Sequence, residues 1–123
     1  MYTILKSTFF AGVLGLVLSG LAFAHAHLAS ATPPADATVA ASPTELDLKF
    51  SEPINLKFSG VKVAGPDNAV ISTGAASLAT GDDSTLLVPV LVTLPAGTYA
   101  VDWHVLSKDG HKTHGSYTFT VKP

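Results

Sequence analysis

The sequence contains no cysteine, no arginine and only one methionine, Met1. Without cysteine the folded chain has no disulfide bonds, and both thiolate metal sites and thiol catalysis are excluded. Stability must therefore come from core packing. The net charge is −2, and all seven basic residues are lysines. A mildly acidic chain without arginine argues against nucleic-acid binding and against binding to anionic lipids.

A charge-free apolar run occupies residues 9–22 and is preceded by Lys6. Such a run followed by Ala22-Phe23-Ala24 is typical of a signal peptide that is cleaved after its last alanine. A transmembrane anchor is the alternative, but a run of about 14 residues is shorter than the ~20 that span a bilayer. A second small-residue pattern ends at Ala26, and cleavage there would leave His27 as the first residue instead.

Cleavage after Ala24 divides the chain into a signal peptide, residues 1–24, and an exported domain, residues 25–123. The exported part is long enough for one domain with one core. It keeps six lysines and nine acidic residues, so its net charge is −3 with neutral histidines. It contains no methionine. Neither of the soft sulfur ligands, thiolate or thioether, is then available to a metal ion.

The apolar residues of the exported part alternate with polar ones, which is the period of a β-strand. Strands are predicted over Glu45–Phe50, Thr98–Leu106 and Ser116–Val121, and an apolar run extends over Thr85–Val92. Pro89 interrupts that run, so an edge strand or a bulge is expected there. Turn signals rich in glycine, proline and aspartate separate the runs. The pattern predicts an all-β fold, either a β-sandwich or a small Greek-key barrel of the immunoglobulin-like kind.

His25 is informative because cleavage after Ala24 would make it the first residue. An N-terminal histidine offers its α-amine and its imidazole to one metal ion, and the two close a chelate ring. The α-amine has an ordinary pKa of about 7.7–8.0, well below that of a lysine, so it loses its proton readily to a metal. The alternative is that this residue is an arbitrary first residue without a function.

A second candidate is the segment Asp109-Gly110-His111. Residues two apart on an extended segment point the same way, so a carboxylate oxygen and an imidazole nitrogen would converge. The alternative is a simple turn with two solvated side chains. Together with His25, these residues offer three nitrogens and one oxygen, a set that suits a tetragonal Cu(II) ion. Zinc remains possible, although the Irving–Williams order favours copper.

At this point the sequence resembles the CopC family of copper-resistance proteins, and the resemblance extends over the whole exported part. The matching segments are HAHL (25–28), TPPAD (32–36), LKFSEP (48–53), GTY (97–99), VDW (101–103), SKDGH (107–111) and GSYTF (115–119). Two features depart from the family pattern. The methionine-rich segment that binds Cu(I) in some members is absent, and Lys112 stands where proline is common.

The resemblance implies a seven-stranded Greek-key β-barrel in the periplasm with a single Cu(II) site. The ligands that it implies are His25, Asp109 and His111, and in some members the glutamate corresponding to Glu52 approaches the metal. The implied function is that of a copper carrier or buffer in copper resistance or uptake. The implied partner is an inner-membrane transporter of the CopD type. The protein is expected to be a monomer.

The other three histidines have simpler interpretations. On a strand His27 would share a face with His25, so it is a candidate for orienting the site or for ligation. His104 alternates away from the face of Tyr99 and Trp103 and is expected to be exposed. His114 is expected in a turn over residues 112–115. Both are interpreted as ordinary surface histidines.

Two other functional classes compete with a copper carrier. An N-terminal histidine with a second histidine on copper resembles the histidine brace of copper monooxygenases, which would make the protein an enzyme. Those enzymes are usually larger and commonly contain disulfides, and an aspartate ligand favours Cu(II) over redox cycling. A plain immunoglobulin-like structural module without a metal is the third possibility. Composition and pattern favour a metal-binding protein without catalysis.

Overall fold

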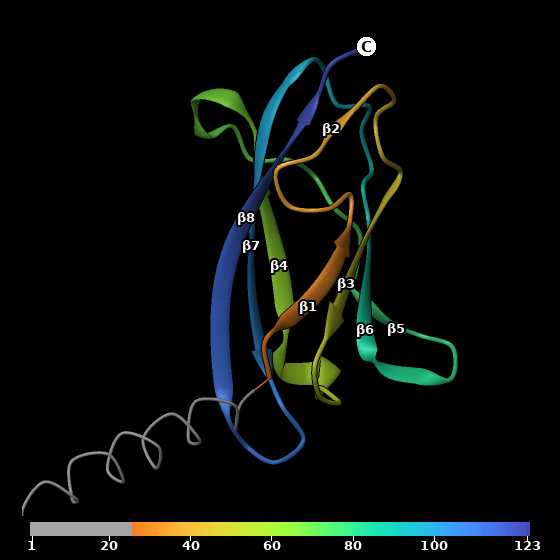
Figure 1. Ribbon diagram of the computed structural model, residues 1–123, viewed down its shortest axis with the longest axis vertical. Coiled ribbons are helices and arrows are strands. Elements are labelled where there is room, and N and C mark those ends of the chain that lie inside the picture. The colour runs from red at the N-terminus through yellow and green to blue at the C-terminus, as the bar shows by residue number, and fades with distance from the viewer. Residues whose placement is uncertain (1–25) are drawn as a thin grey trace, which may run out of the picture.

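The computed structural model describes residues 26–123, which form a β-sandwich (Figure 1). The predicted signal peptide, its cleavage position and His25 lie outside the described residues. One sheet has the strand order β1-β3-β6-β5 and the other the order β2-β8-β7-β4. Their bounds are β1 (Leu28–Thr32), β2 (Thr38–Val39), β3 (Glu45–Phe50), β4 (Gly60–Ala64), β5 (Ser77–Ala79), β6 (Asp82–Pro89), β7 (Gly97–Leu106) and β8 (Lys112–Val121).

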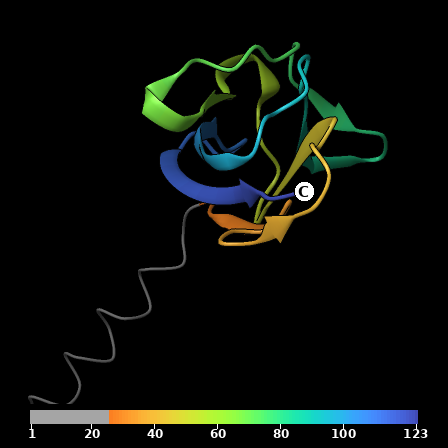
Figure 2. The same cartoon turned by 90° about the horizontal axis from the view of Figure 1, so that it is seen from above.

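Most strand neighbours are antiparallel, and only β2 pairs with β8 in parallel. Two short 3₁₀ helices, η3 (Leu56–Phe58) and η4 (Pro66–Asn68), flank β4. Viewed from above, the strands of the two sheets surround a common interior (Figure 2). Within residues 26–123 no helix is long and apolar enough to cross a membrane.

The core lies between the sheets and follows the period-two pattern of the longest strands. On β7 the burial alternates, and Tyr99 and Trp103 point inward. The ring of Trp103 meets Phe50 of the opposite sheet edge-on, with centroids 5.0 Å apart, and Tyr99 stacks on Phe119 at 5.7 Å. Aromatic pairs in these arrangements contribute beyond the area that they bury. The contact between Trp103 and Phe50 joins the two sheets without any disulfide, whereas Tyr99 and Phe119 are neighbours within the second sheet.

The sequence prediction of an all-β sandwich is confirmed, with three differences in detail. The described residues form two sheets of four strands each, close to the expected number of about seven, and the sheets do not close into a barrel. Pro89 is not on an edge strand, because β6 lies between β3 and β5. It is instead the last residue of β6, a position where the missing backbone N–H interrupts few hydrogen bonds between strands. Finally, β8 begins at Lys112, four residues before the predicted start.

The connections at one end of the sandwich tie the two sheets together. The segment after β3 donates from Ile54 N to the carbonyl of Asp83 (2.9 Å) and from Asn55 N to the carbonyl of Leu106 (2.8 Å). These partners belong to the start of β6 and the end of β7, which are in different sheets. The same end carries the loop between β7 and β8. Chain segments that are distant in the sequence therefore meet there.

Candidate metal centre

The loop between β7 and β8 is a tight reversal that places Asp109 beside His111. It is closed by hydrogen bonds from Ser107 N to the carbonyl of His111 (2.9 Å) and from Gly110 N to the carbonyl of Ser107 (2.9 Å). Gly110 has φ = +93°, a conformation that side chains disfavour and glycine adopts freely. The segment is thus a turn and not the extended strand expected from the sequence. The convergence of the two side chains results from the turn.

Ser107 holds this loop in place from inside the protein. It is 1 % exposed and is the only buried polar residue, aromatic residues aside, among residues 26–123. Its hydroxyl donates to Oδ1 of Asp109 and accepts from the backbone N–H of His111 (3.2 Å). One buried hydroxyl therefore fixes both the carboxylate of one candidate ligand and the backbone of the other. A buried group that is fully hydrogen-bonded in this way restricts the loop to one conformation.

The side chains of Asp109 and His111 contact each other at the surface. The Oδ1 atom of Asp109 lies 3.1 Å from Nδ1 of His111, and both side chains are about half exposed. The pKa of Asp109 is lowered, first by the hydrogen bond from the Ser107 hydroxyl and then by the bond with the His111 ring. The carboxylate is accordingly ionised at neutral pH. An anionic oxygen and an imidazole nitrogen, two atom types that bind metal ions, are thus held side by side in a hydrogen bond.

The described chain begins next to the segment that follows β3. His27 N donates to Oγ of Ser51 (3.0 Å), and Ser51 N donates to the carbonyl of His27 (2.9 Å). Ala26 is buried in the core, whereas His27 is exposed. This pair of hydrogen bonds fixes the start of β1 against Ser51. The start of the described chain therefore lies at this end of the sandwich.

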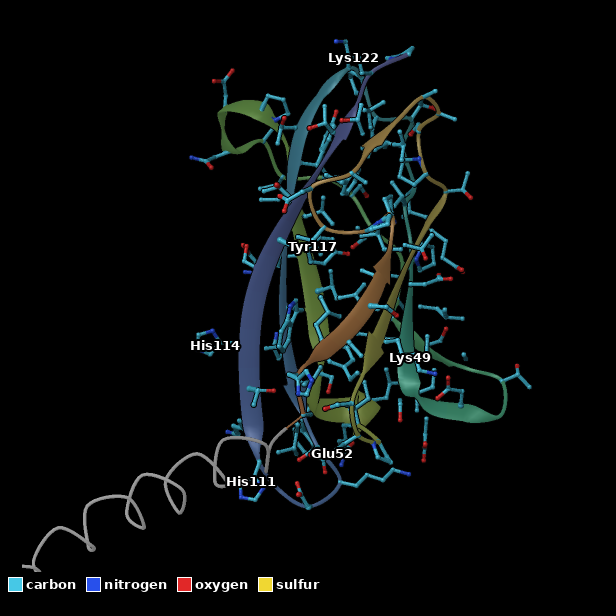
Figure 3. The ribbon with its side chains drawn as sticks, viewed as in Figure 1. Lys49, Glu52, His111, His114, Tyr117 and Lys122 are labelled. Atoms are coloured by element: carbon cyan, nitrogen blue, oxygen red, sulfur yellow. The ribbon has the colours of Figure 1, made fainter. Side chains whose placement is uncertain are left out.

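The segment Ser51–Pro53 connects the chain start to the Asp109 loop. Ser51 bonds to His27, as described, and the carbonyl of Pro53 accepts from Lys108 N (3.1 Å). Glu52 lies between them and is half-buried. Figure 3 shows Glu52 and His111 at the same end of the molecule, with Lys122 at the opposite end. Hydrogen bonds thus join the start of the described chain to the segment Ser51–Pro53, and join that segment to the Asp109 loop.

The described residues do not complete a metal site by themselves. No three His, Asp or Glu side chains between residues 26 and 123 gather closely enough to hold an ion. Asp109 and His111 lie together, and Glu52 and His27 lie at the same end without joining them. His25 lies outside the described residues.

The supporting roles of two residues, Ser107 and Ser51, are not among the predictions from the sequence, although both stand in segments that match the CopC pattern. The sequence did contain a signal for Ser107, because Ser-x-Asp-Gly is a turn pattern in which side-chain oxygens bond to the local backbone. Ser51 gave no comparable signal, since its partner is 24 residues away. Hydrogen bonds of that range depend on strand register, which the local pattern does not fix.

The remaining histidines, His104 and His114, lie on β7 and β8, the two strands that this loop joins, and are on the outer face of their sheet. Both are exposed, as expected. The predicted turn at residues 112–115 is wrong, however, because His114 lies within β8 directly opposite His104 of β7. The start of β8 is polar and has no alternating apolar pattern, so it forms a strand only because it pairs with β7. The two imidazoles therefore belong to one surface, separate from the Asp109–His111 pair.

Comparisons with known proteins match nearly the whole described chain. Residues 28–122 match the family model of the CopC domain. Protein YobA of Escherichia coli K12 is 50% identical over 100 residues, which are 81% of either chain. The crystal structure of CopC from Methylosinus trichosporium OB3b has a TM-score of 0.75 at 31% identity and covers 80% of this chain and 95% of its own. That of PcoC, a methionine-rich copper resistance protein from Escherichia coli, has a TM-score of 0.71 at 39% identity, with 80% and 100% covered.

Proposed function

The chain belongs to the CopC family, and from this premise we propose that it binds one Cu(II) ion and carries or buffers copper in the periplasm. The family consists of copper-binding resistance proteins and not of enzymes, which removes the two competing classes, a copper monooxygenase and a metal-free module. The ligands that we propose are His25, Asp109 and His111. The observation that carries this proposal is the contact between the last two.

The geometry of that contact is compatible with two neighbouring positions around one ion. Two donors at about 2.0–2.1 Å from a metal and at a right angle to each other are separated by about 2.9 Å. Oδ1 of Asp109 and Nδ1 of His111 are 3.1 Å apart. The donors are an oxygen and a nitrogen, which Cu(II) accepts in tetragonal sites. An ion bound by both atoms would replace the hydrogen bond that now joins them.

The other half of the donor set is proposed to come from His25. Its α-amine and imidazole would complete a set of three nitrogens and one oxygen. This requires export and removal of residues 1–24, so a signal peptide cleaved after Ala24 is part of the proposal. The position of His27 supports His25 as a ligand, because His27 is bonded to Ser51 at the end of the sandwich that carries Asp109. His27 and Glu52 are proposed to orient the site without ligating the ion.

The oxidation state follows from the donors. Cu(I) prefers soft sulfur ligands, and the chain has no cysteine and no methionine after Met1. One solved relative, PcoC, is methionine-rich by contrast. We therefore propose a single Cu(II) site and no Cu(I) site. The bound copper would pass to an inner-membrane transporter of the CopD type, and the carrier would act as a monomer.

A Cu(II) titration of the exported chain against a competing chelator tests this ligand set. We expect one ion per chain, and we expect Asp109→Ala and His111→Ala each to weaken binding by at least about tenfold. The matched control is His104→Ala, which removes an exposed imidazole on the same sheet. It should leave the affinity unchanged. Equal losses from the His104 and His111 variants would refute the assignment.

A further inference from the structure

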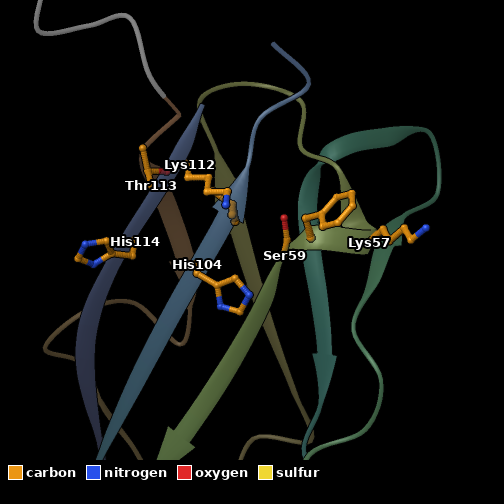
Figure 4. Close-up of a pocket in the computed structure, with 8 residues that line it drawn as sticks. Lys57, Ser59, His104, Lys112, Thr113 and His114 are labelled. Atoms are coloured by element: carbon orange, nitrogen blue, oxygen red, sulfur yellow. The ribbon is translucent and has the colours of Figure 1, made fainter. Parts of the chain in front are cut away.

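A groove of about 450 Å³ lies on the outer face of the second sheet, next to the candidate metal centre. One wall is η3 with Lys57 and Phe58, and the other is the start of β8 with Lys112 and His114 (Figure 4). His104 of β7 lies between these walls. Its ring occupies the space beside Gly60, where an added Cβ would stand 2.9 Å from the ring. The absent side chain of Gly60 thus makes room for the imidazole.

The groove is basic although the protein is acidic. Lys57 and Lys112 are exposed lysines, and two imidazoles accompany them. No aspartate or glutamate of residues 26–123 lines the groove. Lys49 and Lys108, in contrast, form ion pairs with Asp82 and Asp83. Neither of the groove lysines has an ion pair within the described part of the chain, so their charge is available to a partner.

The groove also has an apolar contact surface. Phe58 is 54% exposed, and the ammonium group of Lys57 lies 5.7 Å from its ring centroid. Aromatic residues are enriched in protein–protein interfaces, so this side chain offers a partner an apolar contact beside a cationic group. The absence of arginine disfavours phosphate-bearing ligands, which are usually read by planar bidentate guanidinium groups. Carboxylates with an apolar neighbour fit better.

Both walls continue directly from segments of the candidate metal centre. Lys112 follows His111, and η3 follows the segment that contains Glu52. A chain seated between these walls would therefore lie beside the Asp109–His111 pair. Metal exchange between two proteins requires such proximity of the donor and acceptor sites.

We propose that this groove binds an acidic segment of a partner protein that exchanges copper with the Asp109–His111 site. The glutamate or aspartate side chains of that segment contact Lys57 and Lys112, and an apolar side chain packs on Phe58. That the exchanged metal is copper rests on the proposed function. The docking itself does not require bound metal.

The test uses the exported chain without metal, so that its result does not depend on copper binding. The probe is a capped heptapeptide with three glutamates on each side of a tryptophan, and its counterpart has lysines in place of the glutamates. In a two-dimensional NMR titration, the acidic peptide should shift the amide signals of Lys57–Ser59, His104 and Lys112–His114. The shifts should weaken as the salt concentration rises from about 0.05 M to about 0.3 M.

The double variant Lys57→Glu/Lys112→Glu should weaken peptide binding by about tenfold or more, because charge reversal opposes an acidic segment. The matched control is Lys122→Glu, an exposed lysine at the other end of the molecule (Figure 3), which should change the affinity less than about twofold. Equal binding of the lysine peptide, shifts located elsewhere, or equally tight binding of free glutamate would overturn the proposal. If the peptide binds as expected while the ligand variants leave the copper affinity unchanged, docking stands and the proposed copper site fails.

Discussion

The aromatic core and the Ser107–His111 loop are held together in opposite ways. In the core, Phe50, Trp103 and their neighbours pack large apolar surfaces across two sheets. In the loop, the half-exposed carboxylate of Asp109 and the backbone of His111 are held by one buried hydroxyl, that of Ser107. The core derives its stability from buried area, and the loop derives its geometry from a few hydrogen bonds.

This difference implies that folding and metal binding can be changed separately. A change in the core should alter the free energy of unfolding and affect copper only through the loss of folded protein. A change in the loop should alter copper affinity while the sandwich remains folded. Substitutions in the core and in the loop can therefore test whether stability and copper affinity change independently.

The largest effect is expected at Gly115, which faces the core from β8 opposite Trp103. An added Cβ there would lie 2.5 Å from Cζ2 of Trp103, so a larger side chain must displace the indole. Gly115→Val should lower the free energy of unfolding by about 3 kcal/mol. Chemical denaturation measures this loss. The folded fraction should still bind Cu(II) with unchanged affinity.

The matched control for this change is Ser116→Val on the outer face of the same strand. The added side chain is exposed there, so the free energy of unfolding should change by less than about 0.5 kcal/mol. If both valine variants destabilise the protein equally, the close contact between Gly115 and Trp103 is not what specifies this part of the core.

A smaller loss of stability, but a direct loss of binding, is expected for Ser107→Ala. The change removes the donor to Asp109 and the acceptor for His111 N, which should cost about 1–2 kcal/mol in unfolding free energy. Cu(II) affinity should fall by about tenfold because the two ligands are no longer held together. Denaturation and chelator competition measure the two effects.

Ser59→Ala provides the comparison for that variant. The Ser59 hydroxyl also makes two hydrogen bonds, donating to the carbonyl of Asn55 (2.8 Å) and accepting from Leu106 N (3.1 Å). It contacts none of the proposed ligands. Its loss should cost similar stability and leave copper affinity intact. Equal losses of affinity in both variants would show that Ser107 acts only through general stability.

The smallest effect is expected at Asp82, which belongs to neither region. Its pKa is lowered, first by the hydrogen bond from the Thr85 hydroxyl and then by that from Ser84 N. Because the pKa of Asp82 is lower in the folded than in the unfolded state, its ionised carboxylate stabilises the fold at pH values above the ordinary carboxylate pKa. This stabilisation is lost as the pH falls through the lowered pKa. Asp82→Asn should slightly lower the thermal midpoint at pH 7. The difference from the unchanged chain should shrink in acid; a difference independent of pH would contradict this cause.

The core could be predicted from the sequence more completely than the site. Strict alternation over Glu45–Phe50 and Thr98–Leu106 locates β3 and β7 with almost the observed bounds, because each has one buried face. The start of β8 could not be found in this way, since Lys112–Gly115 has no apolar alternation and forms a strand only by pairing with β7. The short edge strand β1 likewise has no periodic burial.

The candidate ligands were suggested by motif, but their arrangement was not. The Asp109–His111 pair was expected on an extended segment and is formed by a turn with Gly110 in a positive-φ conformation. The basic groove gave no sequence signal at all. Lys57 and Lys112 are far apart in the chain, and only the packing of η3 beside β7 and β8 brings them to one surface.

The central claim is that the free amine of His25 is a copper ligand, and one variant tests it most directly. A single glycine is added ahead of His25 in the exported chain, and intact mass confirms the first residue of both proteins. All imidazoles and carboxylates remain, but the amine becomes a peptide nitrogen that coordinates poorly. We expect Cu(II) affinity to fall by about 100-fold or more, the EPR spectrum to change and the thermal midpoint to stay the same. An unchanged affinity with the same spectrum, or a natural chain that begins at His27, would contradict the account.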